Sequence, residues 1–142
     1  MTLKSLKPFT RDVETPAGKI TVRGLSLEDM TLIFNRHRAE VAAFAATVKV
    51  AEGMSEELLA NLAGRLLTEL PQVTAEIIAV ADGEFDEESI AIARSLPAPV
   101  QIELIDAIGG LTFHTEEQLK KAVETVIKLV RGATNAVANL RA

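Results

Sequence analysis

The chain has 142 residues, no cysteine, only 4% aromatic residues and a net charge of −5. Its hydrophobic fraction of 48% argues against intrinsic disorder, and its length suits one domain with its own core. The lack of cysteine excludes disulfides and thiolate chemistry, and the negative charge disfavours binding to nucleic acid. We expect neither a membrane span nor a signal peptide, because no apolar run is long enough for either.

The first 25 residues predict a β-hairpin. Apolar and polar residues alternate on both sides of the stretch TPAG, in which Pro16 and Gly18 are turn residues. Ile20 and Val22 then share one face. We therefore assign residues 1–25 to a hairpin segment and residues 26–142 to a helical body, the two forming one domain.

From Ser26, a candidate N-cap, apolar residues recur at intervals of three and four, which indicates a helix. One helix is predicted to run from there to about Val50. A second is predicted over residues 55–70. Its successor over residues 72–81 follows Pro71, which suits a first helical turn, and ends at Asp82 and Gly83.

Three further helices are predicted after this point. One follows the cap Asp86 and stops before the prolines of residues 97–99, and the next ends at the pair Gly109–Gly110. Thr115 and Gln118 have the spacing of a capping box, so a last helix starts at residue 116. The predicted fold is mainly α, with a small N-terminal hairpin followed by about six helices in a compact bundle.

Two short stretches are candidates for ligand sites. AIGGLTFHTEE, residues 107–117, lacks the lysine of a phosphate loop, and its acidic residues would repel phosphate, so we interpret it as a joint between helices. The acidic run of residues 82–88 fails the calcium-loop pattern, since Glu87 stands where glycine is needed and Ala93 where glutamate is needed. We interpret it as a solvated turn.

His37 lies on the apolar stripe of the first long helix, and H-x-x-x-H is absent. A half-buried or interface histidine is favoured over a metal ligand or a catalytic base. No serine lies in G-x-S-x-G. We therefore expect no catalytic, cofactor-binding or metal-binding residues and no cofactor. A hydrolase or metal protein would require His37, His114 and the acidic turn to converge.

The first and last helices carry long apolar stripes, which form either core faces or binding surfaces. The stripe of the first helix is the candidate partner-binding surface and contains Met30, Phe34, His37, Val41 and Phe44. The last helix is the candidate for self-association, through Val126, Val130, Val137 and Leu140. We expect a homo-oligomer.

Residues 93–132, ARSLPAPVQIELIDAIGGLTFHTEEQLKKAVETVIKLVRG, resemble the C-terminal half of bacteriophage tail assembly chaperones, also called pre-tape-measure proteins. The opening, with its short β element and its RGLS step into a long helix, resembles the start of the same proteins. The resemblance covers about two thirds of the chain and includes no catalytic motif.

This resemblance implies a small, helical, non-enzymatic assembly factor of the host cytoplasm, absent from the mature virion. Such proteins bind the tape measure protein before the tail tube polymerises around it. Many have a longer form, made by programmed frameshifting, that recruits tail tube protein. The alternative is a structural tail completion or connector subunit that stays in the virion. Neither function involves a membrane or nucleic acid.

Overall fold

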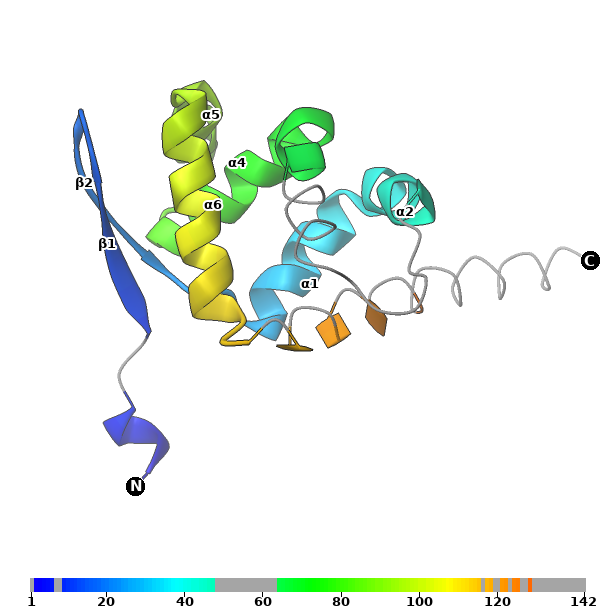
Figure 1. Cartoon of the computed structure of the whole chain (residues 1–142), viewed down its shortest axis with the longest axis horizontal. Helices are drawn as coiled ribbons and strands as arrows, with labels where there is room; N and C mark the ends of the chain where they lie inside the picture. The colour runs from blue at the N-terminus through cyan, green and yellow to red at the C-terminus, as the bar shows by residue number, and fades with distance from the viewer. Residues whose placement is uncertain are drawn as a thin grey trace, which may run out of the picture.

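The computed structural model describes residues 2–6, 9–47, 64–115, 117–118, 121–122, 124–125 and 128. Over this part of the chain the protein is mainly helical with a two-stranded hairpin near the N-terminus, so the predicted fold class is confirmed. The hairpin lies on one side of a central group of helices, and the first two helices lie on the other (Figure 1). A short 3-10 helix, η1 (Leu3–Ser5), precedes the hairpin.

The hairpin consists of β1 (Thr10–Thr15) and β2 (Gly18–Arg23), which are antiparallel and joined by a two-residue turn. Gly18 has a φ of 141°, a conformation that favours glycine. Val13 and Val22 are buried against the helices. The hairpin predicted from alternation is confirmed.

The single helix predicted over residues 26–50 is wrong. The structure has two helices there, α1 (Leu27–Arg36) and α2 (Arg38–Thr47), which meet at His37. His37 has φ −128° and ψ 34°, outside the helical range. Its ring and the side chain of Arg36 are both bonded to a carboxylate of a later helix. This tertiary contact redirects the chain at a place where the apolar period is unbroken.

The helices predicted after Pro71 and after Asp86 begin and end close to the residues that the sequence indicated. α4 (Pro71–Asp82) begins at its proline and is followed by Gly83, whose φ of 88° is left-handed. Asp86 caps α5 (Glu87–Ser95), because its carboxylate accepts a hydrogen bond from the backbone N–H of Ser89 at 2.8 Å. These predictions are confirmed.

α6 (Ala98–Thr112) continues through Gly109–Gly110, where the sequence predicted its end, so that prediction is wrong. The last turn is held by the residues that connect β2 to α1. A Cβ on Gly24 would lie 2.8 Å from the carbonyl oxygen of Leu111. Thr112 Oγ1 accepts a hydrogen bond at 2.9 Å from the backbone N–H of Leu25. These contacts keep the segment helical past the glycines.

Two predicted helices are only partly described. Residues 64–69 are helical, and the rest of the helix predicted over residues 55–70, apart from Leu70, lies outside the described residues. After α6, Thr115 Oγ1 accepts from the N–H of Gln118 at 3.1 Å, as the capping box predicts. The Gln118 amide oxygen accepts from the N–H of His114, the residue before Thr115, at 2.9 Å.

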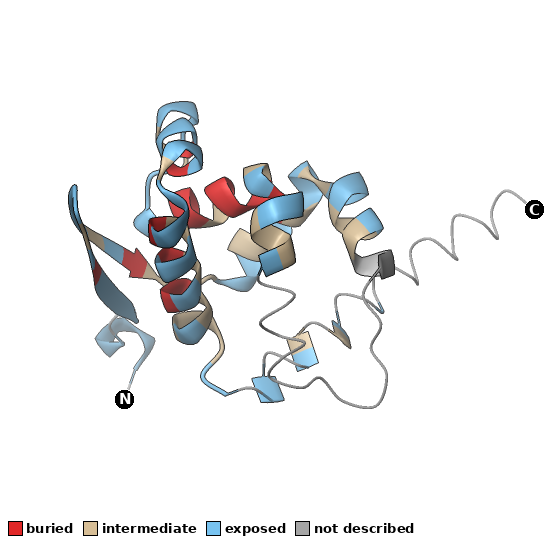
Figure 2. Ribbon diagram, turned by 45° about the horizontal axis from the view of Figure 1, so that its top comes forward, coloured by how far each residue is buried: buried red, intermediate tan, exposed pale blue. Residues whose placement is uncertain are grey.

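Buried residues gather where α4, α5, α6 and the hairpin meet (Figure 2). The main cluster contains Val13, Val22, Ala75, Ile78, Ala79, Ala81, Ile90, Ala93, Val100, Leu104, Ala107 and Ile108. A smaller cluster joins α1 to α4 and contains Ile33, Leu70, Val73 and Val80. Phe85 packs against both clusters. The α1–α2 corner therefore rests on α4 through a modest apolar contact, which polar groups supplement.

Candidate partner-binding surfaces

The five residues predicted to bind a partner lie on α1, on α2 and at the corner between them. All five are half-buried: Met30, Phe34, His37, Val41 and Phe44. Leu27, one turn before Met30, is 79% exposed. Because residues three and four apart share a helix face, Leu27, Met30 and Phe34 form an apolar row beside the buried Ile33. We call these three residues the α1 stripe.

Arginine side chains cover the two aromatic rings of the corner. The guanidinium carbon of Arg38 lies 5.9 Å from the centre of the Phe34 ring, and that of Arg65 lies 4.9 Å from the centre of the Phe44 ring. A cation–π contact at an exposed site stabilises by about 0.5–1 kcal/mol. An apolar partner therefore has little free energy to overcome when it displaces the arginine from Phe34.

A buried carboxylate fixes the corner to α4. The side chain of Glu76 is fully buried, and its Oε1 accepts a hydrogen bond from Arg36 Nε while its Oε2 is bonded to His37 Nε2. Arg36 also lies over the ring of Phe85, 5.3 Å from its centre. His37 Nδ1 lies 3.6 Å from the carboxylate of Glu40. A buried charge requires such partners, so the cluster determines where α1 turns into α2.

Sequence reasoning missed Glu76. The available signal was a lone charged residue within VTAEIIAVA, residues 73–81, an otherwise almost wholly apolar stretch. Glutamate is rarely buried unless it is paired, so this position indicates a buried ionic contact. The partners Arg36 and His37 are 40 and 39 positions away and cannot be read from local spacing.

The RGLS step that resembles the tail assembly chaperones is a structural joint. Arg23 Nη1 donates to Asp29 Oδ2 at 2.6 Å, and the same oxygen accepts from the N–H of Ser26 at 2.8 Å. Ser26 Oγ accepts from the N–H of Asp29 at 3.1 Å, which completes a capping box. The guanidinium of Arg23 lowers the pKa of Asp29, and the bonds to Ser26 lower it further. The step thus ties β2 to the first turn of α1.

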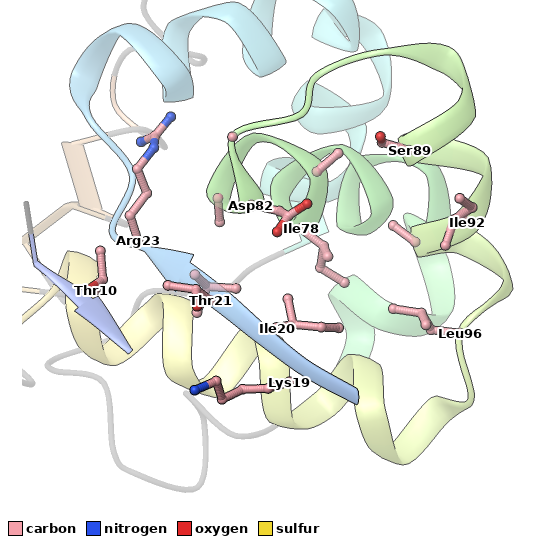
Figure 3. Close-up of a pocket in the computed structure, with 15 residues that line it drawn as sticks. Thr10, Lys19, Ile20, Thr21, Arg23, Ile78, Asp82, Ser89, Ile92 and Leu96 are labelled. Atoms are coloured by element: carbon pink, nitrogen blue, oxygen red, sulfur yellow. The ribbon is translucent and has the colours of Figure 1, made fainter. Parts of the chain in front are cut away.

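A second surface lies on the hairpin side of α4. It is an open groove of about 720 Å³ between the outer edge of β2 and helices α4 and α5 (Figure 3). Its apolar lining includes Ile20, Ile78, Ile92 and Leu96. Ile92 is 58% exposed, so the groove presents apolar surface to solvent.

The charges at this groove are unevenly compensated. Lys19 Nζ lies 3.4 Å from Asp12 Oδ2, and Arg23 is paired with Asp29. Asp82 also lines the groove, and among the described residues it has no ion-pair partner. Burial raises the pKa of Asp82. The uncompensated charge of the groove is therefore negative.

The other candidates have structural roles. His114 is exposed, and its ring contacts Phe9 edge-on with the centroids 5.3 Å apart. The acidic turn supplies the cap Asp86 and the anchor Phe85. Within the described part of the chain, no three histidine, aspartate or glutamate side chains are grouped as a metal site requires.

The residues predicted to mediate self-association lie outside the described residues: Val126, Val130, Val137 and Leu140. Their role stays a prediction, as does the division of the chain at residue 25. None of the helices in the described ranges has both the length and the apolar character that a bilayer span requires.

A comparison with protein families agrees with the pattern of the sequence. A family model described as pre-tape measure protein matches residues 1–142. The chain belongs to the pre-tape measure protein family. This membership links it to the tape measure protein of phage tails. Searches of curated proteins and of solved structures give no significant match.

Proposed function

We propose that this pre-tape measure protein is a non-enzymatic tail assembly chaperone that binds the tape measure protein and keeps it soluble until the tube forms. Family membership supports the link to the tape measure protein. The α1 stripe supports the binding step, because it is an apolar helical row that the protein's own core leaves partly open.

The chemistry of this surface suits a helical partner that must be released later. An amphipathic helix packs into such a surface with residues at intervals of three and four. Met30 has a flexible thioether that adapts to differing partners, and Phe34 has an arginine cover that moves at small free energy. Single contacts of this kind are weak, and many copies along one tape measure chain would bind tightly through avidity.

The Glu76 cluster supports the same proposal. It holds α1 and α2 at a defined corner before a partner arrives, so the binding surface is ordered in advance. Order established on folding reduces the entropy lost on binding. We infer that Glu76, Arg36 and His37 position the surface, and that the stripe itself contacts the partner.

The wider assembly scheme is part of the proposal. The protein acts in the host cytoplasm, self-associates and leaves before the virion matures, and a longer frameshifted form recruits tail tube protein. Family membership supports the tape measure link in this scheme.

Co-expression tests the proposed function. The tape measure protein of the same phage is produced alone, with the wild-type chain, and with the double variant Leu27→Asp/Phe34→Ala. Asp at position 27 suits the first turn of α1, so it should not disturb that helix. Ile102→Asp, which changes a 52% exposed residue of α6, is the matched control. We expect soluble tape measure protein with the wild type and the control only.

Mass spectrometry of purified virions separates this function from that of a structural tail subunit. A chaperone is absent from mature particles, whereas a completion or connector subunit is present in a fixed ratio to the tube protein. A stoichiometric signal from this chain in virions would favour the structural alternative.

A further inference from the structure

The N-terminal residues 2–6 form an arm that stands apart from the helical body (Figure 1). Leu3 is 86% exposed and Leu6 is 54% exposed. Lys4, between them, is exposed and has no ion-pair partner among the described residues. The arm is thus a short segment with apolar and cationic side chains, and it contributes nothing to the core.

The groove between β2 and α4–α5 has the complementary properties. Its floor is apolar, and the charge that lacks a partner there is the carboxylate of Asp82 (Figure 3). Arm and groove therefore match in both apolar character and charge.

The helical turn of the arm adds a further match. η1 is a 3-10 helix, so Leu3 and Leu6, three positions apart, lie on the same face of the arm. One apolar face of this kind suits the apolar floor of the groove.

We propose that the arm of one copy, residues 2–6, docks in the β2–α4–α5 groove of a second copy. Leu3 and Leu6 contact the apolar floor around Ile92, and the ammonium group of Lys4 pairs with Asp82.

This contact is head-to-tail, since arm and groove are different surfaces. Repetition of such a contact gives a closed ring or an extended row of copies, according to the angle between neighbours. The inference goes beyond the proposed function. It also differs from self-association through the predicted last helix, because it uses residues 2–6 and the β2–α4–α5 groove instead of Val126, Val130, Val137 and Leu140.

Disulfide trapping tests the contact cleanly, because the native chain has no cysteine. Leu3→Cys and Ile92→Cys chains, distinguished by a mass tag, are oxidised separately and as an equimolar mixture. A disulfide requires Cα atoms within about 7 Å, so only a docked arm gives efficient linkage. Mixtures of Leu3→Cys with Ile102→Cys, whose site lies on exposed α6 surface outside the groove, give the background.

We expect the Leu3–Ile92 mixture to give at least tenfold more cross-linked heterodimer than the Leu3–Ile102 mixture. Each single variant should give only background homodimer. Equal yields from the two mixtures would overturn the proposal. A chain that carries both Leu3→Cys and Ile92→Cys gives a second check, because disulfides formed only within single chains would also overturn it. Both sites are exposed, so the variants should fold, which circular dichroism verifies.

Charge reversal gives an independent test by analytical ultracentrifugation. Lys4→Glu and Asp82→Lys should each weaken self-association at least tenfold, and the double exchange should restore it. Unchanged association in both single variants would contradict the Lys4–Asp82 pair. A tape measure segment that occupied the groove instead would leave self-association unaffected by these changes, which also overturns the proposal.

Discussion

The imidazole of His37 is bonded to the buried carboxylate of Glu76, 39 positions later in the chain. This bond and the neighbouring one from Arg36 hold the α1–α2 corner on α4. His37 thus has a structural partner, and the apolar α1 stripe next to it is the surface that we propose for a tape measure helix. The cluster of Glu76, Arg36 and His37 therefore holds in place the corner that carries the proposed binding surface.

Replacing Glu76 should destabilise the protein. Glu76→Gln keeps the shape of the side chain but removes its charge and replaces one acceptor oxygen with an NH2 group, which then faces Arg36 or His37. We expect a loss of about 1–3 kcal/mol in the free energy of unfolding, as for other buried polar groups that lose a partner. Urea titration followed by circular dichroism measures this loss.

Glu69→Gln is the control for that measurement. Glu69 pairs with Arg65 on the protein surface, and its side chain is 49% exposed. Its replacement should change the free energy of unfolding by less than about 1 kcal/mol. Equal effects at the two positions would show that Glu76 has no special role in holding the corner.

Gly24 should not tolerate a side chain. A Cβ there would lie 2.8 Å from the Leu111 carbonyl oxygen, which belongs to backbone and cannot swing away. Gly24→Ala should lower the free energy of unfolding by about 1–3 kcal/mol, as overpacking generally does. Gly110→Ala has open space around the new methyl group and lies inside α6, so it should raise stability by up to about 1 kcal/mol. Thermal melts of both variants test this, since the melting temperature should fall for Gly24→Ala and rise for Gly110→Ala.

Asp29 should make stability depend on pH in the acid range. Its pKa is lowered in the fold, first by Arg23, so its stabilising contribution is complete above the ordinary aspartate value of 3.8. The contribution is lost as the pH falls through the lowered value. Asp29→Asn should therefore cost about 1 kcal/mol at pH 7 and progressively less below pH 3.8. Urea unfolding across this range measures the difference, and a constant difference would contradict the assigned cause.

The ionised carboxylate of Asp82 should lower the stability of the fold, whereas that of Asp29 raises it. Burial raises its pKa, so the ionised form is less favourable in the folded state than in the unfolded state. It also places negative charge at the C-terminal end of α4. Asp82→Asn should raise stability at pH 7, and the gain should vanish as the pH falls below 3.8. The measurement requires dilute protein, because the proposed arm contact would stabilise the wild type at higher concentration.

Local signals were sufficient where one residue decides a boundary. Pro71, Gly83 and Asp86 begin, end and cap helices as their backbone and hydrogen-bonding preferences predict. The hairpin was equally predictable, because alternation and a turn between Thr15 and Gly18 specify it locally. Family membership could also be inferred, since it depends on pattern across the chain.

Tertiary contacts explain what the sequence did not predict. The bend at His37 depends on Glu76, and the continuation of α6 past Gly109 and Gly110 depends on contacts around Gly24. Both partners lie far away in the sequence, so no local period reveals them. The groove was missed for the same reason, since it forms only where β2 meets α4 and α5.

Direct binding is the most immediate test of the proposal that the α1–α2 corner holds tape measure helices reversibly. Fluorescence anisotropy would follow labelled helical segments of the tape measure protein titrated with the purified chain. We expect saturable, reversible binding that Leu27→Asp/Phe34→Ala weakens at least tenfold, or about 1.4 kcal/mol, while Ile102→Asp leaves it unchanged. Absence of binding by the folded wild-type chain, or equal affinity in the double variant and the control, would contradict the proposal.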